Sequence, residues 1–305
     1  MRRIGSSCNP ACRNLACRND PSPRGTRLDP FHLRRGDAPL IISMPHVGTH
    51  LPADLADSMT PMARRVPDTD WHTDRLYGFA AAGKDFAAAG EGFAAAGEAT
   101  VIAATHSRYV IDLNRAPDNR SLYPGADNTE LCPLTTFDHE PIYLPGQEPD
   151  GTETARRIES FWQPYHDAIA SEIARLCGRH GRILLWDAHS IRSEVARFFA
   201  GRLPDFNLGT GDGTTADAEL AGRVVASAEA ENGYTTACNG RFKGGHITRH
   251  FGRPDKGVHA IQLELSQATY MEEKPPFRFL PTQAARVSGA IERMIRAGLG
   301  WIAEG

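Results

Sequence analysis

The sequence PLIISMPHVG, at residues 39–48, is a short apolar run that ends at a Pro-His pair. An apolar run of this length followed by turn residues is typical of a buried strand. Open α/β sheets place their functional side chains at the C-terminal ends of such strands. The stretch therefore predicts an α/β fold and makes His46 the first candidate functional residue.

Two later stretches repeat this design. RILLWDAHS, at residues 182–190, is an apolar run that ends in Asp187 and His189, and VHAIQLEL, at residues 258–265, carries Glu264 inside an apolar run. Each residue has a simpler interpretation, as a hydrogen-bonded structural histidine or a glutamate that faces solvent. Three occurrences of one pattern favour a shared site, because two imidazoles and a carboxylate on separate buried strands can hold a metal and transfer a proton.

A further source of metal ligands is the carboxylate-rich stretch DTDWHTDRL at residues 68–76, which we expect to open a helix. Asp70 and Asp74 are four residues apart, so on a helix they would share one face, and one could coordinate a metal while the other supports it. The alternative is that acidic residues at a helix N-terminus only complement the helix dipole.

Two arginines bracket the stretch SRYVIDLNR at residues 107–115, which we expect to be a strand. Arginine binds carboxylates through paired, planar hydrogen bonds, so Arg108 and Arg115 are candidates for holding an anionic substrate. The alternative is a structural ion pair with Asp112 or Asp118.

Positive charge is also concentrated in FKGGHITRHFG, at residues 242–252, around two adjacent glycines. Glycine lets a backbone approach a ligand closely, and the cluster is cationic in an acidic protein. Lys243, His246 and Arg249 are therefore candidates for binding an anion, and a solvated hairpin turn is the alternative.

Length, charge and cysteine content set the class of protein. The chain of 305 residues has a formal net charge of -3 and a pI near 6.5, so it has no basic field that would attract nucleic acid. No apolar run approaches the ~20 residues needed to cross a bilayer, and no signal peptide follows Arg2 and Arg3, so we expect a cytoplasmic protein without a membrane partner. The 6 cysteines match no zinc or disulfide spacing, which is typical of a reducing compartment.

Composition and periodicity predict the domain organisation. Residues 1–35 are rich in Arg, Asn, Pro, Ser and Cys without periodicity, so we expect a disordered extension. Residues 36–305 alternate helical and strand patterns, which predicts a single catalytic α/β domain. Within it we expect loops at residues 119–151 and 207–215, while the Phe-Ala-Ala-Ala-Gly heptads at residues 79–99 have the form of a slipped duplication without chemistry.

Together, six stretches resemble the N-formylglutamate deformylases, also called N-formylglutamate amidohydrolases. They are SMPHVG, DWHTD, SRYVIDLNR, WDAHS, KGGHITR and QLE, in this order, and the resemblance runs from Phe31 to Trp301. It implies a metal-dependent hydrolase with a zinc-carboxypeptidase-like (phosphorylase/hydrolase-like) fold, a three-layer α/β/α sandwich around a mixed, mostly parallel sheet. It also implies release of formate and L-glutamate from N-formyl-L-glutamate, late in histidine degradation.

The resemblance further implies roles for individual residues. A Zn²⁺ ion, or another divalent metal, would be held by His46, Asp70 and His189; Thr49 stands where the carboxypeptidase His-x-x-Glu pattern has its glutamate, so the acidic ligand is expected to be Asp70, with Asp74 as second choice. Glu264 would accept and return a proton. The other expected contacts are Asp187 and Asp74 behind the metal ligands, Arg115 beside Asn114 on a substrate carboxylate, and Arg108, Lys243, His246 and Arg249 on the remaining negative charge.

Two other kinds of function are compatible with the same residues. The first is a related N-acylamino-acid deacylase or a metallocarboxypeptidase-like peptidase on the same fold. The second is an anion-binding protein that uses the arginine and lysine cluster without a metal. In each case we expect a small anionic molecule as the partner and a monomer or small homo-oligomer as the assembly.

Overall fold

The computed structural model describes residues 28–81, 98–121, 125 and 127–304. Most of the predicted heptad stretch, residues 82–97, and residues 1–27 of the predicted extension lie outside the described residues. No helix in the described part of the chain is both long and apolar enough to cross a membrane.

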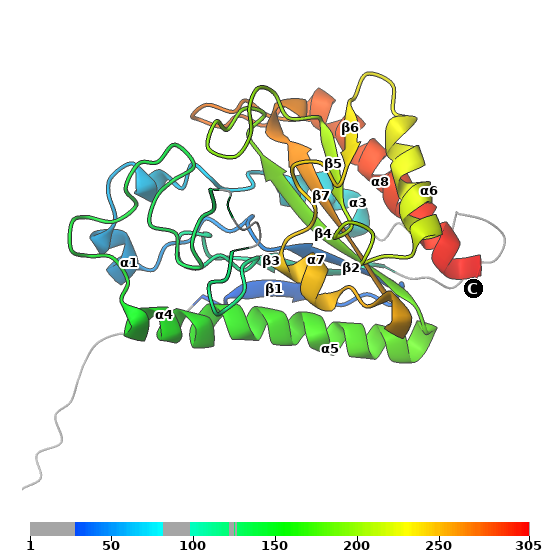
Figure 1. The fold of residues 1–305 in the computed structure, drawn as a ribbon, viewed down its shortest axis with the longest axis horizontal. Coiled ribbons are helices and arrows are strands. Elements are labelled where there is room, and N and C mark those ends of the chain that lie inside the picture. The colour runs from blue at the N-terminus through cyan, green and yellow to red at the C-terminus, as the bar shows by residue number, and fades with distance from the viewer. Residues whose placement is uncertain (1–27, 82–97, 122–124, 126, 305) are drawn as a thin grey trace, which may run out of the picture.

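Seven strands form one mixed sheet (Figure 1). Their order across the sheet is β1 (Phe31–Arg34), β3 (Thr100–Ala104), β2 (Leu40–Met44), β4 (Ile183–Ile191), β7 (Val258–Ser266), β5 (Phe206–Gly209) and β6 (Thr236–Cys238). Strands β3, β2, β4 and β7 are parallel to one another, and β6 is parallel to β5. Strands β1 and β5 pair antiparallel with β3 and β7. The predicted mixed, mostly parallel sheet is confirmed.

Helices cover both faces of this sheet. Figure 1 shows α5 along one side and α6 and α8 on the other. The helices and helical turns are α1 (Ala53–Ser58), η1 (Ala63–Arg65), α2 (Thr73–Leu76), α3 (Gly78–Ala81), α4 (Gly151–Arg157), the π-helical turn η3 (Ile158–Trp162), α5 (Gln163–His180), α6 (Ala218–Glu229), α7 (His246–Phe251), η4 (Pro254–Lys256), η5 (Gln267–Thr269) and α8 (Pro281–Glu304). The architecture is therefore helix, sheet, helix.

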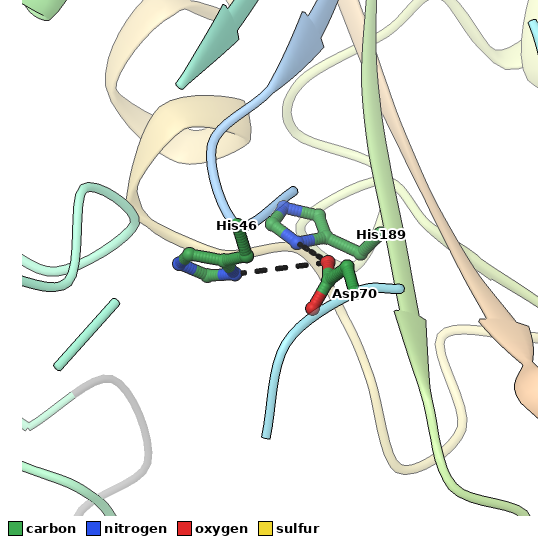
Figure 2. Close-up of side chains that lie close together, drawn as sticks. All are labelled: His46, Asp70 and His189. Atoms are coloured by element: carbon green, nitrogen blue, oxygen red, sulfur yellow. Dashed lines mark hydrogen bonds and ion pairs between the residues drawn. The ribbon is translucent and has the colours of Figure 1, made fainter. Parts of the chain in front are cut away.

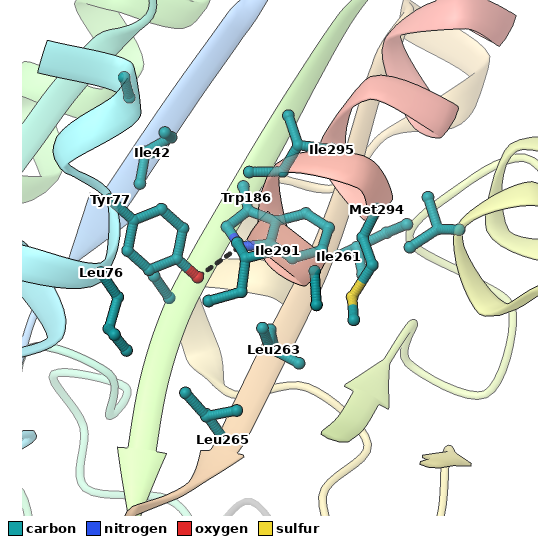
Figure 3. Close-up of a cluster of buried hydrophobic side chains, with 14 of the residues drawn as sticks. Ile42, Leu76, Tyr77, Trp186, Ile261, Leu263, Leu265, Ile291, Met294 and Ile295 are labelled. Carbon is teal, nitrogen blue, oxygen red and sulfur yellow. Dashed lines mark hydrogen bonds between the residues drawn. The ribbon is translucent and has the colours of Figure 1, made fainter. Parts of the chain in front are cut away.

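The central strands are apolar on both faces because each face meets a helix layer. Side chains alternate along a strand, so Leu184 and Trp186 pack with α6 and α8 while Ile183 and Leu185 pack with α5. Trp186 is fully buried, and its Nε1 donates a hydrogen bond to the Tyr77 hydroxyl over 2.8 Å (Figure 3). The buried indole N–H therefore has a hydrogen-bond partner inside the core on the α8 side of the sheet.

The structure corrects four expectations about local structure. Residues 31–34 form the edge strand β1, so they belong to the sheet and not to a disordered extension of residues 1–35. Residues 107–115 form turns and irregular backbone and not a strand, with local bonds such as Val110 N to Ser107 O and Arg115 N to Asp112 O. The predicted loop at residues 207–215 begins inside β5, and the predicted hairpin alternative at residues 242–252 contains the helix α7.

A long connection joins β3 to α4, and its described residues, 105–121, 125 and 127–150, form no helix or strand. It includes the loop predicted at residues 119–151, apart from residues 122–124 and 126, which lie outside the described residues. Its backbone bonds are local or reach neighbouring loops, as when Asp112 N donates to Leu131 O over 2.7 Å. This connection runs past the C-terminal ends of β2 and β4 and supplies several side chains to the site described next.

Candidate active site

Three buried side chains with metal-binding atoms meet at the C-terminal ends of the central strands (Figure 2). His46 follows β2, His189 lies near the end of β4, and Asp70 comes from the loop before α2. One nitrogen or oxygen of each lies within 4.8 Å of the others, and none of the three residues is more than 4% exposed. The sequence-predicted ligand set is therefore brought together in space.

Asp70 connects the two histidines. Its Oδ2 accepts a hydrogen bond from Ser190 N over 3.1 Å and lies 3.2 Å from His189 Nδ1 and 3.8 Å from His46 Nδ1. Burial alone would raise the pKa of Asp70, but the hydrogen bond from His189 and the neighbouring charges lower it overall. Asp70 is therefore ionised at neutral pH, the form in which a carboxylate binds a metal.

His46 has one ring nitrogen occupied and one directed at Asp70. Its Nε2 lies 2.7 Å from Oδ1 of Asp112, a buried carboxylate that can only accept, so Nε2 carries the proton. Burial and the charge of Arg108 lower the pKa of His46, so the ring is neutral. Nδ1 therefore presents a lone pair to the Asp70 oxygen 3.8 Å away. Two acceptors that face each other in a buried site are an arrangement that a cation satisfies.

His189 has the same relation to a second aspartate. Its Nε2 lies 3.2 Å from Asp187 Oδ1 and 2.9 Å from Asn114 Nδ2, while Nδ1 faces Asp70. Burial lowers the pKa of His189, but Asp187 and Asp70 raise it well above the ordinary value overall. Within the described residues, Asp187 Oδ1 is buried without a hydrogen bond of good geometry. Asn114 Nδ2 can only donate, so in its contact Nε2 is the accepting nitrogen, whereas a metal at Nδ1 would require a proton on Nε2, directed toward Asp187 Oδ1.

Glu264 lies beside these ligands because of strand register. Residues 189 and 264 are direct partners in the β4–β7 ladder, and both side chains project to the α5 face. Glu264 is 7% exposed, and Gln262 Nε2 donates to its Oε2 over 3.0 Å. Burial, with Asp70 adding to it, raises the pKa of Glu264 to about 8. A carboxyl group with such a pKa is suited to accept and return protons near neutral pH.

The orientation of Gln262 is fixed by the glycines of residues 244–245. Gly245 N donates to Gln262 Oε1 over 2.6 Å, which leaves the Gln262 amide nitrogen for Glu264. A Cβ at Gly245 would lie 2.2 Å from Asn114 Nδ2, so no larger residue fits this approach. The glycine pair therefore has a packing role next to the site.

A pocket of about 570 Å³, open to solvent, lies over these groups. Arg108, Asn114 and Arg115 of the predicted substrate-binding residues line it. The lining residues that no sequence motif predicted are Asn128, Phe137, Ile191, Phe198, Arg241, Phe242, Gly245 and Gln262. They come from loops and strands without a shared motif, although Phe242 and Gly245 lie in the predicted cationic cluster of residues 242–252 and Arg241 directly precedes it.

Three predicted substrate-binding residues do not line the pocket. Lys243 Nζ lies 3.1 Å from Asp212 Oδ1, and Arg249 Nε donates to Gly244 O over 2.8 Å. The His246 ring stacks on the ring of His250 with 5.1 Å between centroids. His246 and Arg249 lie on α7 and Lys243 lies just before it, and none of the three lines this pocket, so their contact with the substrate stays a prediction.

Asp74 is also outside the site. Asp70 precedes α2, which begins at Thr73, and His72 between them has a left-handed backbone with φ of 63°, so the two aspartates do not share a helix face. Asp74 is exposed and borders a different hollow, with His50 and His72. The supporting position predicted for Asp74 is taken by Asp112, which the sequence suggested only as an ion-pair partner of an arginine.

Arg108 and Asn114 line the pocket but are engaged by protein groups. Arg108 Nη2 donates to Asp112 Oδ2 over 2.9 Å, and its Nη1 lies 3.8 Å from Asp70 Oδ1, so the ion-pair alternative holds for this arginine. Asn114 Oδ1 accepts from Ile247 N over 2.8 Å, while its Nδ2 contacts His189. Through these contacts Arg108 and Asn114 help to position the side chains that could bind a metal.

A mixed α/β sheet that carries a buried His-Asp-His group beside a carboxyl group of raised pKa has the parts of a hydrolytic enzyme. The family model described as N-formylglutamate amidohydrolase matches residues 38–271. The chain belongs to this family, and the predicted resemblance is confirmed.

Individual relatives agree with this assignment. The chain is 47% identical over 268 residues to an N-formylglutamate deformylase of Pseudomonas aeruginosa, covering 88% of this chain and 95% of the relative. It is 46% identical over 274 residues to the N-formylglutamate deformylase of Pseudomonas putida, covering 90% and 96%.

Two solved structures share the fold. An N-formylglutamate amidohydrolase from Ralstonia eutropha superposes with a TM-score of 0.71 at 28% identity, covering 88% of this chain and 97% of the other. A gene product from Agrobacterium tumefaciens has a TM-score of 0.60 at 19% identity, covering 88% and 94%, and it supports the fold alone.

Proposed function

We propose that this protein hydrolyses N-formyl-L-glutamate to L-glutamate and formate with a divalent metal, Zn²⁺ or another, held by His46, Asp70 and His189. The observation that carries the metal proposal is the buried His46, Asp70 and His189 group, in which His46 Nδ1 lies 3.8 Å from an Asp70 oxygen. The substrate is the one named for the deformylases that this chain resembles at 46% and 47% identity.

The donor atoms fit such a metal. Two imidazoles and one carboxylate are a ligand set that catalytic zinc sites use, with a further position left for water or substrate. Asp112 and Asp187 would hold the outer nitrogens of His46 and His189, which fixes both rings and raises their affinity for a metal. When bound, such a metal would lower the pKa of a water molecule to about 7, which makes it able to attack the formamide carbon.

The chain's own residues would perform the proton transfers. Glu264 would take the proton of the attacking water and return it to the amine nitrogen of the leaving glutamate, so one carboxylate serves as base and then as acid. Arg108 lies behind Asp70 and lines the pocket, where its charge would stabilise the oxyanion that forms on the formyl group.

Arg115 would hold the carboxylate next to the scissile amide. Its Nε and Nη2 donate to Thr129 O and Oγ1, both over 3.1 Å, so the side chain is fixed where it lines the pocket. Asn114, predicted to share this task, has both amide atoms in bonds within the protein and would instead orient His189.

We also propose the finer assignments of the family resemblance. These are a zinc-carboxypeptidase-like arrangement of the sheet and site, a place late in histidine degradation, and activity in the cytoplasm on a small anionic substrate.

Formate release by purified protein, measured before and after metal removal with a chelator, tests the function directly. Wild-type protein should lose activity on removal and regain it with Zn²⁺. Glu264→Gln should keep its metal while kcat falls by at least ~10²-fold, the lower end of what a positioned acid/base contributes. Glu148→Gln, an exposed site, is the matched control.

Three outcomes would contradict parts of this proposal. No formate release by metal-loaded wild type would reject the function. Metal loss in Glu264→Gln would make Glu264 a ligand, and a near-normal kcat in that variant would place the base elsewhere. Faster hydrolysis of N-acetyl or peptidyl glutamates would favour a deacylase or a peptidase.

A further inference from the structure

The pocket contains three arginines, and they differ in what surrounds them. Arg108 lies among carboxylates, 2.9 Å from Asp112 and 3.8 Å from Asp70. Arg115 and Arg241 belong to different loops, and the bonds that place them go to oxygens of Thr129 and Phe198. Arg108 therefore contacts the carboxylates in and behind the metal-binding group. Arg115 and Arg241 line the same pocket and are anchored to other loops.

Arg241 is held in a defined position by aromatic residues. It follows β6, and its Nε donates to the carbonyl of Phe198 over 2.5 Å. Its guanidinium carbon lies 5.8 Å from the centroid of the Phe198 ring and 5.4 Å from that of the Phe242 ring. Cation–π contacts at these distances stabilise the charge and limit the rotamers of a long side chain. Arg241 therefore presents a cation in a fixed place.

The wall that carries Arg241 is apolar. Phe198 contacts Phe137 edge to face, with 4.9 Å between centroids, and belongs with Ile191, Val195 and Leu203 to a small separate core. Phe137, Ile191, Phe198 and Phe242 line the pocket. A carboxylate that enters beside such a wall loses water on one side, so it is stable there only if a cation compensates.

The charge of the proposed substrate matches these two arginines. The inference rests on the proposed function. Formylation removes the positive charge of an amino acid, so an N-formyl dicarboxylic amino acid has two negative charges and no positive one. The carboxylate beside the amide is common to every N-formyl amino acid, whereas the second one belongs to the side chain. Arg115 and Arg241 are two separately anchored cations for two separate carboxylates.

We propose that Arg241 binds the side-chain carboxylate of the substrate and thereby selects N-formylated dicarboxylic amino acids over those with a neutral side chain. Arg115 binds the carboxylate that all of these substrates share. The selection follows from charge, because a neutral side chain forgoes the charge-assisted pair with Arg241 beside the apolar wall.

N-formyl-L-glutamine is the probe that separates the two arginines, because it has the size of N-formyl-L-glutamate without the second charge. For Arg241→Gln we expect kcat/KM to fall about 10- to 100-fold on N-formyl-L-glutamate and to change less than about 3-fold on N-formyl-L-glutamine. Arg115→Gln should lower kcat/KM for both. Arg202→Gln removes the same charge from an exposed site, 54% accessible and paired with Asp205, and should change neither.

Equal losses on both substrates in Arg241→Gln, or no loss on either, would overturn the proposal. Wild-type protein provides a test that requires no variant, because it must prefer N-formyl-L-glutamate to N-formyl-L-glutamine at least ~10-fold in kcat/KM. Equal rates in wild type overturn the role of Arg241 while leaving deformylation in place. No formate from either substrate would instead reject the proposed function.

Discussion

His46 Nε2 and Asp112 Oδ1 lie 2.7 Å apart, on the side of the imidazole away from Asp70. Asp112 is completely buried, and its other oxygen accepts from Arg108 over 2.9 Å. Burial would raise the pKa of Asp112, but His46 and Arg108 hold it well below its ordinary value. The carboxylate therefore stays charged and fixes the proton of His46 on Nε2.

Asp112→Asn should weaken metal binding about 10- to 100-fold, because the amide no longer fixes the tautomer and basicity of His46. Metal affinity measured by competition with a chelator checks this prediction. Asp118→Asn, at an exposed aspartate in the same connection, is the control. An unchanged affinity in Asp112→Asn would mean that His46 needs no partner to bind the metal.

The two aspartates of residues 68–76 should behave differently. Asp70→Asn should lose most of its metal and its activity, since it removes one of three ligands from a buried site. Asp74→Asn should retain both, because this side chain is exposed and separate from the ligand group. Metal content after dialysis decides between them, and metal loss in Asp74→Asn would return Asp74 to the site.

The raised pKa of Glu264 predicts a pH dependence of stability in the metal-free protein. With a pKa of about 8 in the folded chain against an ordinary value of 4.5, the folded state binds more protons between these pH values. The free energy of unfolding should therefore decrease as pH rises from about 4.5 to about 8. Glu264→Gln lacks this ionisation, so its Tm should fall less between pH 5 and pH 8. Parallel Tm profiles for the two proteins would contradict the assignment.

The edge strand β1 predicts where truncation becomes damaging. Its residue Phe31 contacts Tyr165 of α5 with 5.8 Å between ring centroids, and all four residues of β1 pair with β3. A chain that begins at residue 36 should melt at least ~5 °C below a chain that begins at residue 28, since each kcal/mol is worth ~2–4 °C at this size. Equal melting temperatures would show that β1 adds no stability.

The sequence identified those site residues that stand at the ends of apolar runs. His46, His189 and Glu264 were found because buried parallel strands leave a continuous apolar signal and end at the edge where loops gather. The residue pattern offered both Asp70 and Asp74 as the acidic ligand, and only the structure shows which of them lies beside the histidines. The left-handed turn at His72, which directs the two side chains apart, is a property of the folded chain.

Other parts of the molecule had no sequence signal of this kind. Arg241 and Phe198 are 43 residues apart and meet only because separate loops pack together. Strand β1 has 4 residues, too few to show an alternating pattern. Strand β5 looked like a glycine-rich loop, and its pairing with β7 overrides that weak local preference. Each of these features depends on contacts between residues far apart in the sequence, so local sequence patterns could not predict them.

The partnership of residues 189 and 264 in the β4–β7 ladder has a consequence for how this protein can change. The spacing between ligand and base is set by backbone hydrogen bonds in the centre of the sheet, where a shift of one residue would reverse every side chain. Arg115 and Arg241 belong to loops, whose length and composition can vary without disturbing that ladder. New substrate preferences can therefore arise at the rim of the pocket while the bond-breaking groups keep their positions.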